Sequence, residues 1–310
     1  MPRPFKQVDV FTAQPYLGNP LAVVLDGTGL SDAAMQRFAQ WTNLSETTFL
    51  LPPTEAGRQG GADYRVRIFT PGNELPFAGH PTLGSCHAWL QAGGQPRAAQ
   101  HIVQECQVGL VAIRQEGPRL AFAAPPLTRS APSPMLLAKV AAALGLKAHH
   151  IVAAQMLDNG PVWLGLLLDS VQTVLQLTPD HLELKNLGLK VGVAAVEPAQ
   201  DAPVLIARSN REARAFGEHA AEPGEAAPEP TVEVRAFAAP VGILEDPVTG
   251  SFNASLAQWL IADGHAPARY LASQGTCLGR EGRVWVERDA SGQVWVGGES
   301  VTCIDGQVTL

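Results

Sequence analysis

Residues 67–90, RIFTPGNELPFAGHPTLGSCHAWL, and residues 235–260, RAFAAPVGILEDPVTGSFNASLAQWL, present the same features in the same order. Each segment begins as a strand, passes through a proline-containing acidic loop into a turn of Gly, Thr and Ser, and ends as a helix closing on Trp-Leu. The copies lie about half a chain apart, which is too far for a solenoid repeat. Two similar domains are therefore predicted, with a chance likeness of composition as the alternative because the identities are few.

The rest of the chain predicts many short strands and only a few helices. Alternating patterns predict strands at 64–68 and 232–236 and a hairpin that joins 284–286 to 294–296. N-cap signals predict three helix starts: Ser31-Asp32 (with Ala34, Met35, Phe38 and Trp41 on one face), Ser133-Pro134 (before 135–144, stopped by Gly145) and Thr178-Pro179. This mixture favours an α+β fold over a doubly wound parallel sheet.

Two stretches suggest how the domains are connected. Residues 123–134 hold four prolines and are typical of an interdomain linker. Residues 210–230 lack apolar periodicity and are typical of an exposed insertion. The predicted domains are 1–124 and 125–299, and 300–310 is a candidate return strand that would complete the first domain.

Composition limits the classes of function. A formal net charge of −7 with scattered basic residues argues against a nucleic-acid surface. No apolar stretch approaches the roughly 20 residues that cross a bilayer, and the first residues carry no signal segment. The four cysteines are far apart and form no CxxC pair, which favours buried reduced thiols over a disulfide framework. A cytoplasmic protein without a membrane or nucleic-acid partner is the expectation.

The repeated turn has a chemical meaning. A Gly/Thr/Ser turn that enters a helix leaves backbone N–H groups unpaired at the positive end of the helix dipole, which is an anion site. Two such turns, around Gly79 and around Gly250-Ser251, predict a cleft that binds a small carboxylate and stabilises developing negative charge. The alternative is that Gly79, Gly84 and Gly250 only bend or cap the chain. The sequence has no GxxxxGK[ST], no GxGxxG between a strand and a helix, no HExxH and no metal-like Cys/His spacing.

Three side chains near these turns are candidates for acid–base chemistry. Glu46 stands between a predicted helix and an apolar strand, where partial burial would raise its pKa toward neutrality. His80 lies inside the first turn and Asp246 just before the second. A solvated Glu46 and ordinary helix caps at His80 and Asp246 are the structural alternatives. We interpret His149 and His150 as surface or loop residues.

Six motifs in order over nearly the whole chain resemble the PhzF-like phenazine-biosynthesis family: Asp9-Val10-Phe11-Thr12, 18–24 (GNPLAVV), 44–47 (LSET), 67–71 (RIFTP), 77–82 (FAGHPT) and 242–251 (GILEDPVTGS). The resemblance implies a diaminopimelate-epimerase-like fold with two pseudo-symmetric domains. Each domain would be a curved, mostly antiparallel, barrel-like sheet around a central helix. It also implies a cofactor-independent isomerase, a cleft between the domains and a homodimer.

The same resemblance assigns residue roles. It places the catalytic glutamate at Glu46, with His80 and Asp246 as catalytic partners and with Ser45, Gly79, Gly250 and Ser251 as substrate-binding residues. Wider relatives of this fold use two cysteines as bases, and the corresponding positions here are predicted to be Ala78 and Pro247, which cannot transfer protons. A single-base proton shift on a carboxylate substrate is therefore the leading hypothesis, because a racemase normally needs groups on both faces. A non-catalytic carboxylate-binding protein and a one-base epimerase are the alternatives.

Overall fold

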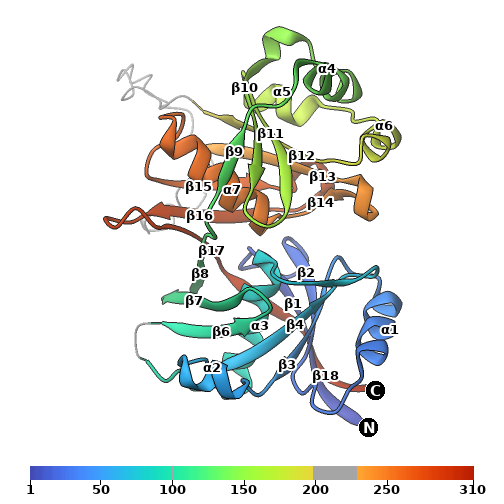
Figure 1. Ribbon diagram of the computed structural model, residues 1–310, viewed down its shortest axis with the longest axis vertical. Helices are drawn as coiled ribbons and strands as arrows, with labels where there is room; N and C mark the ends of the chain where they lie inside the picture. Colours follow the sequence, from blue (N-terminus) through green and yellow to red (C-terminus); the bar gives the residue numbers. More distant parts are fainter. Residues whose placement is uncertain (99–100, 198–228) are drawn as a thin grey trace, which may run out of the picture.

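The computed structural model describes residues 1–98, 101–197 and 229–310, which form two lobes (Figure 1). All but the last two residues of the predicted insertion at 210–230 lie outside the described residues. The first half contains β1 (Pro2–Val10), β2 (Asn19–Val24), α1 (Asp32–Thr42), β3 (Thr47–Leu51), α2 (Glu55–Gln59), β4 (Tyr64–Phe69), β5 (Glu74–Leu75), α3 (Gly79–Gln91), β6 (Ile102–Cys106), β7 (Gly109–Glu116) and β8 (Arg119–Ala123).

The second half contains β9 (Thr128–Ser130), α4 (Pro134–Ala143), β10 (Ile151–Asp158), β11 (Val162–Leu168), α5 (Val171–Gln176), α6 (His181–Asn186), β12 (Lys190–Val196), β13 (Val232–Ala238), β14 (Ile243–Asp246), α7 (Gly250–Ala262), β15 (Arg269–Gln274), β16 (Gly282–Arg288), β17 (Val294–Gly298) and β18 (Ser300–Thr309). Short 3₁₀ turns occupy Ala148–His150, Ala239–Val241 and Thr276–Leu278.

The two halves repeat one pattern of strand pairing. Along β1-β2-β3-β4-β6-β7-β8 the pairings are antiparallel, parallel, antiparallel, parallel, antiparallel and antiparallel. The series β10-β11-β12-β13-β15-β16-β17 repeats these six pairings in the same order. A helix of 13 residues stands at the same place in each series, α3 before β6 and α7 before β15. The internal repeat seen in the sequence therefore corresponds to two halves with one topology.

Each of the two series is followed by a strand that pairs with the first strand of the other series. β9 follows β8 and pairs antiparallel with β10, whereas β18 follows β17 and pairs antiparallel with β1. The proline-rich stretch 123–134 is thus not a plain linker, because three of its residues form β9. β8 also pairs with β17, so the sheet continues from one lobe into the other. The boundary at residue 124 and the extent of each domain remain predictions.

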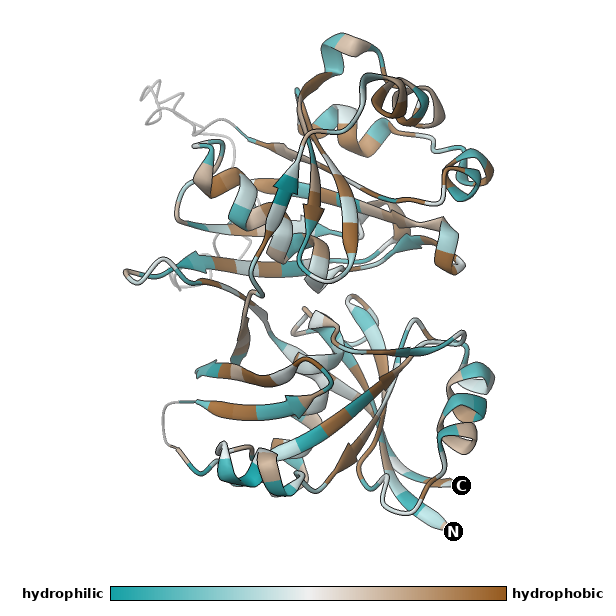
Figure 2. Ribbon diagram, in the orientation of Figure 1, coloured by the Kyte–Doolittle hydropathy of each residue, from teal (hydrophilic) through white to brown (hydrophobic). Residues whose placement is uncertain are grey.

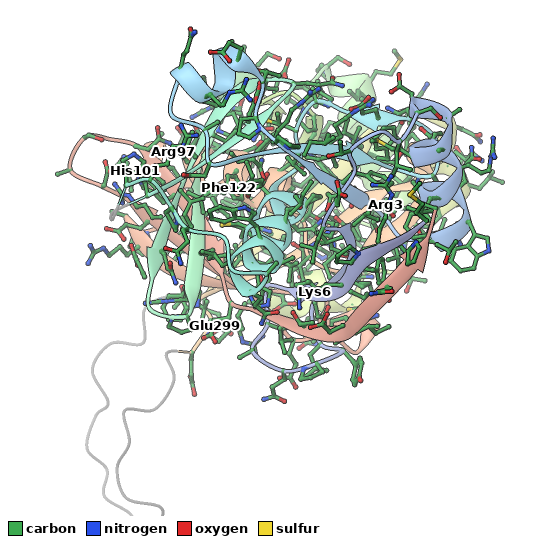
Figure 3. The ribbon with its side chains drawn as sticks, turned by 90° about the horizontal axis from the view of Figure 1, so that it is seen from below. Arg3, Lys6, Arg97, His101, Phe122 and Glu299 are labelled. Atoms are coloured by element: carbon green, nitrogen blue, oxygen red, sulfur yellow. The ribbon has the colours of Figure 1, made fainter. Side chains whose placement is uncertain are left out.

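Helices α3 and α7 each lie within the curved sheet of their own half. In the view from below, α3 runs through the middle of the lower lobe with strands around it and Phe122 beside it (Figure 3). Polar and apolar residues alternate along the first part of β4 (Figure 2), and its apolar residues are buried. This burial is the main stabilising term for such a sheet. Both central helices are largely buried, which fixes the position of their first turns.

Two of the predicted helix starts are confirmed, while the third start and the position of Trp41 are corrected. Helix α1 has Ser31 as its N-cap and α4 has Ser133, as expected. The third predicted helix, expected to start at Thr178-Pro179, is α6, which begins at His181. Its N-cap is Asp180, because the Asp180 carboxylate accepts two backbone N–H bonds. Trp41 is 79% exposed rather than part of the buried face of α1, and it stacks on Phe38.

The cysteines are free, but they do not share one environment. Cys86 and Cys106 are buried, Cys303 is half-buried and Cys277 is exposed, so the expectation of buried thiols is wrong for Cys277. Over the described ranges, none of the helices combines the length and the apolar character that a membrane-spanning helix requires.

Candidate active site

The first turns of the two central helices meet between the halves. A Cβ atom added to Gly79 would lie 2.9 Å from the Cα atom of Gly250, and one added to Gly250 would lie 2.9 Å from the Cα atom of Gly79. Real Cβ atoms do not approach other atoms so closely, so only glycine at both positions permits this contact. The two glycines that the repeat predicted as anion-binding therefore bring the two helix N-termini together.

Neither of these helix N-termini has a side-chain cap. The N-cap residues of α3 and α7 are Ala78 and Thr249, and neither side chain accepts a hydrogen bond from its helix. The other described α-helices, α1, α2, α4, α5 and α6, all have a capping Ser, Thr or Asp. Unpaired N–H groups and the helix dipole favour an anion at both ends. His80 and Asp246 do not act as caps.

Glu46 and His80 face each other beside the start of α3. Glu46 lies directly before β3, and its side chain is 13% exposed, while that of His80 is 4% exposed. Glu46 Oε2 and His80 Nε2 are 3.5 Å apart, and neither atom has a hydrogen-bond partner among the described residues. Such unpaired buried polar atoms are costly in a folded protein. Both atoms are therefore available to bond a ligand that enters the site.

Burial alters the protonation of both groups. Desolvation, reinforced by the negative charge of Asp246 and opposed by the positive charge of Lys190, raises the pKa of Glu46 to about 8. Desolvation lowers the pKa of His80 to about 3, against a hydrogen bond to the backbone of Pro20. At neutral pH His80 is therefore a neutral imidazole. Glu46 holds a proton that it can lose and regain near neutrality.

Asp246 is bonded, unlike Glu46. Its Oδ1 accepts a hydrogen bond of 2.8 Å from Asn19, and its Oδ2 accepts one of 2.7 Å from the Thr249 hydroxyl. Asn19 also donates to the backbone of Val248, so a residue of β2 joins the turn that leads into α7. Desolvation raises the pKa of Asp246 to about 6, while the two side-chain hydrogen bonds act to lower it.

Gln274 holds the second turn in place. Its side chain accepts the backbone N–H of Thr249 and donates to the Thr249 hydroxyl and to the backbone of Asp246. It also accepts from Asn253 in the second turn of α7. These four bonds fix Thr249 and Asp246 relative to the helix that follows. Neither Gln274 nor the role of Asn19 is indicated by the sequence, because both act across long separations.

Lys190, the first residue of β12, is a charged group of this site that the sequence did not indicate. Burial lowers the pKa of Lys190, and the charges of Glu46 and Asp246 oppose this shift. Its Nζ lies 5.6 Å from the centre of the Trp163 ring, and the Trp163 indole donates to the Ser251 hydroxyl. Lys190 is therefore linked through Trp163 to the first turn of α7.

The remaining predicted site residues lie near these groups. Ser45 is half-buried and directly precedes Glu46, and Ser251 occupies the first turn of α7. Counted back from the first helical residue, Ala78 corresponds to Thr249 within the chain, and the match of Ala78 and Pro247 to the cysteines of wider relatives stays a prediction. Neither Ala78 nor Thr249 carries a thiol.

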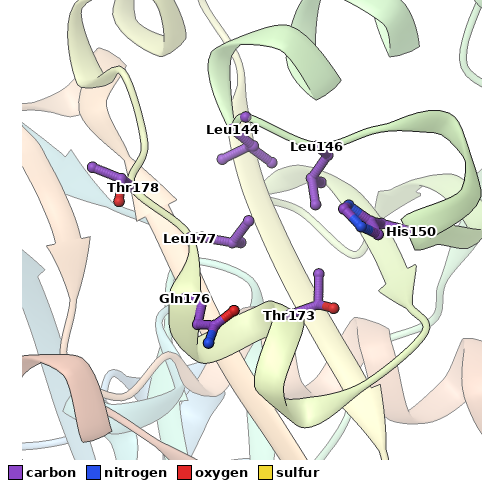
Figure 4. A pocket seen from close by; sticks show the side chains of 8 residues that line it. Leu144, Leu146, His150, Thr173, Gln176, Leu177 and Thr178 are labelled. Atoms are coloured by element: carbon purple, nitrogen blue, oxygen red, sulfur yellow. The ribbon is translucent and has the colours of Figure 1, made fainter.

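A hollow in the second half and the neighbouring His149 and His150 include none of the candidate site residues. Leu144, Leu146, His150 and Leu177 line a hollow of about 380 Å³ in the second half (Figure 4). His149 and His150 lie in a 3₁₀ turn, and His150 accepts the backbone N–H of Lys147. No group of three or more His, Cys, Asp or Glu side chains in the described ranges is arranged to hold a metal ion.

Comparison with known proteins gives one family. Residues 8–306 match the PhzC-PhzF family, described as phenazine biosynthesis-like protein. The chain is 34% identical to antisense-enhancing sequence 1 of Schizosaccharomyces pombe, over 98% of this chain and 97% of that one. It is 31% identical to trans-2,3-dihydro-3-hydroxyanthranilate isomerase of Pseudomonas aeruginosa, over 98% of each chain.

Solved structures agree with the predicted fold class. The structure of a PhzF-family phenazine biosynthesis protein from Enterococcus faecalis superposes with a TM-score of 0.75 over 100% of both chains, at 25% identity. A hydroxyproline epimerase from Agrobacterium vitis superposes with a TM-score of 0.58 over 100% of this chain and 93% of that one, at 14% identity. The α+β, epimerase-like fold expected from the sequence is thus confirmed.

Proposed function

Because the chain belongs to the PhzC-PhzF family of phenazine biosynthesis-like proteins, we propose that it is an isomerase in which Glu46 moves a proton within a small carboxylate-bearing substrate. Relatives that align over nearly the whole chain are named isomerases. Two of these three are named for trans-2,3-dihydro-3-hydroxyanthranilate, a cyclic unsaturated acid. Their substrate need not be shared, since residues in the site and not the fold determine specificity.

One observation carries the proposal. The buried, unpaired oxygen of Glu46 lies 3.5 Å from the buried, unpaired nitrogen of His80, next to two helix N-termini without side-chain caps. The helix termini supply donors for a carboxylate. Glu46 supplies a proton carrier whose pKa of about 8 lies near neutrality. A protein that only bound carboxylates would gain nothing from a second carboxyl group facing its ligand.

The chemistry follows from these positions. The substrate carboxylate accepts N–H bonds of Gly79 and of Gly250-Ser251, where the helix dipoles favour negative charge. The Glu46 carboxylate removes a proton from a carbon of the substrate, and the electron pair of that C–H bond moves into the adjacent unsaturated system. The Glu46 carboxylic acid then returns the proton to another atom of the same substrate. Enclosure between the halves keeps water from exchanging with that proton.

His80 and Asp246 have supporting roles in this scheme. The neutral imidazole of His80 offers one donor or acceptor to the substrate or to Glu46. Asp246, held by Asn19 and Thr249, fixes the turn that supplies the second set of N–H donors. Its negative charge also raises the pKa of Glu46. Ser45, next to Glu46, is a further candidate for contact with the substrate. We also propose a homodimer, which light scattering on the purified protein would test.

The test uses solvent deuterium. The protein is incubated in D2O with trans-2,3-dihydro-3-hydroxyanthranilate and a panel of small amino, hydroxy and cyclic unsaturated acids, and loss or movement of carbon-bound protons is followed by NMR. Glu46→Gln is compared with Glu55→Gln, an exposed glutamate on α2 whose loss leaves the site unchanged. We expect rearrangement with wild type and Glu55→Gln only.

The other outcomes separate the alternatives. Full activity of Glu46→Gln would contradict the role of Glu46. Deuterium incorporation with inversion at one stereocentre would show a one-base epimerase. Binding of several acids with neither loss nor movement of any carbon-bound proton would show a carboxylate-binding protein.

A further inference from the structure

The paired strands give a residue-by-residue correspondence between the two halves. In the repeated segments Arg67 and Phe69 correspond to Arg235 and Phe237. Arg67 makes a two-pronged ion pair with Glu74, and Arg235 makes the same pair with Glu245. Because the two ion pairs have the same geometry, β4 and β13 are equivalent strands, with Arg67 at the position of Arg235.

The register then identifies the counterpart of Glu46. Phe69 lies opposite Thr47 in the pairing of β4 with β3, and Phe237 lies opposite Val191 in the pairing of β13 with β12. Thr47 and Val191 are therefore equivalent positions. The residues that precede them are Glu46 and Lys190, so the second half places Lys190 where the first half places its proton carrier.

Lys190 is a cation whose nearby acids do not contact it. The charges of Glu46 and Asp246 act to raise the pKa of Lys190. Its side chain nevertheless makes no ion pair or hydrogen bond with either of them or with another described residue. Its three donors are thus free, above the face of Trp163. Glu46 is mostly protonated at neutral pH, and both oxygens of Asp246 accept other bonds. A half-buried ammonium group in these surroundings lacks a close negative partner.

We infer that Lys190 contacts the substrate and binds a second anionic group, so that the substrate carries two: one at the helix N-termini and one at Lys190. The symmetry of the two halves places Lys190 across the meeting point of Gly79 and Gly250 from Glu46. A substrate held at that point has the proton carrier on one side and the ammonium group on the other. The same ammonium group would disfavour a substrate that carries a cationic group in place of the second anionic group.

This inference rests on the site of the proposed function, but it is tested by binding and without turnover. Dissociation constants are measured by calorimetry for succinate, glutarate and adipate and for butyrate, pentanoate and hexanoate, in which one carboxylate is replaced by a methyl group. The variants are Lys190→Met, Lys190→Gln and Lys190→Arg. Lys139→Met, an exposed lysine of α4, is the matched control.

We expect at least one dicarboxylate to bind wild type about 10- to 100-fold more tightly than its monocarboxylate partner, since a charge-assisted hydrogen bond has roughly that effect. Lys190→Met and Lys190→Gln should abolish this preference and leave monocarboxylate binding nearly unchanged. Lys190→Arg should retain part of the preference, and Lys139→Met all of it.

Three results would overturn the inference. The first is that wild-type protein binds none of the dicarboxylates, or binds none of them more tightly than the matching monocarboxylate. The second is a preference that survives in folded Lys190→Met or Lys190→Gln. The third is an equal weakening of both kinds of acid, which would mean that Lys190 serves the same carboxylate as the helix termini. Glu46→Gln should keep the preference, so a failure of Glu46 catalysis would not be mistaken for a failure at Lys190.

Discussion

The two halves of the molecule share a scaffold and differ in the residues that face its centre. Both have the same order of strand pairings, an arginine–glutamate pair at equivalent positions and a central helix without a side-chain cap. Glu46 in the first half corresponds to Lys190 in the second, and His80 corresponds to Ser251. The unpaired Glu46 and His80 atoms belong to the first half, whereas the acid of the second half, Asp246, is fully bonded.

This difference separates two tasks. A symmetric pair of bases would serve transfer on both faces of a substrate, as in enzymes that racemise through two groups. Here the first half supplies the proton carrier, and the second supplies a fixed turn and a cation.

The largest expected effect is on turnover. Glu46→Gln removes the group that carries the proton and should lower kcat by about 10²- to 10⁴-fold. Asp246→Asn, in the other half, leaves Glu46 in place and disturbs one hydrogen bond, so it should lower the rate by about tenfold. Steady-state kinetics on the substrate found by the deuterium test measure both. Equal losses would contradict the division between the halves.

The second-largest effect should come from disturbing the contact between the N-termini of α3 and α7. A Cβ at residue 250 would lie 2.9 Å from the Cα atom of Gly79 and 3.0 Å from the backbone nitrogen of His80, and backbone atoms cannot yield without moving a helix. Gly250→Ala should therefore lower kcat/KM by about 100-fold and the free energy of unfolding by about 1–3 kcal/mol. Gly72→Ala, where the nearest atom is 3.8 Å from the new Cβ, should change neither.

A third effect is on stability. The folded protein raises the pKa of Glu46 from 4.5 to about 8, so the folded state binds this proton more tightly than the unfolded state does. The resulting stability is fully present below pH 4.5, falls progressively as the pH rises above 4.5, and is gone once the pH has passed 8. Glu46→Gln has no such carboxyl group and does not lose this stability. Between pH 4 and pH 7 its free energy of unfolding should therefore rise by about 3 kcal/mol relative to that of wild type. Denaturant unfolding at both pH values measures it, and a constant difference would argue against a buried Glu46 carboxyl.

The smallest effect should be on the pH profile. The rising limb of kcat/KM should follow ionisation of Glu46 near pH 8. Lys190→Met removes a positive charge and should move the limb to higher pH, while Asp246→Asn removes a negative charge and should move it to lower pH, each by about half a unit to one unit. His80 is neutral throughout this range. Shifts in the same direction would contradict the charge arrangement.

The sequence predicted the features that depend on local pattern. The repeat gave the two halves, and Ser31 and Ser133 gave helix starts because a cap acts within one turn. The motifs around Glu46 and His80 predicted two side chains that the fold brings to 3.5 Å. The stretch that contains β9 has the composition of a linker, and a strand of three residues leaves no periodicity that would predict it.

Residues that act through long-range pairing could not be predicted. Asn19 contacts Asp246 from 227 positions away, and no local pattern marks it. Lys190 follows Gly188 and Leu189 like an ordinary surface lysine at a strand start, and only the pairing of β12 with β13 makes it the counterpart of Glu46. Trp41 fits the apolar period of α1 but lies beyond the edge of the face that is buried.

The most direct test of the central claim is the titration of Glu46 itself, which requires no substrate. Protein labelled with ¹³C at glutamate carboxyl groups is titrated by NMR, and the Glu46 resonance is identified by its absence in Glu46→Gln. We predict a midpoint near pH 8, set first by burial and then by the charge of Asp246, and a lower midpoint in Asp246→Asn. A midpoint near 4.5, unchanged in Asp246→Asn, would show an ordinary solvated carboxylate and would contradict the account.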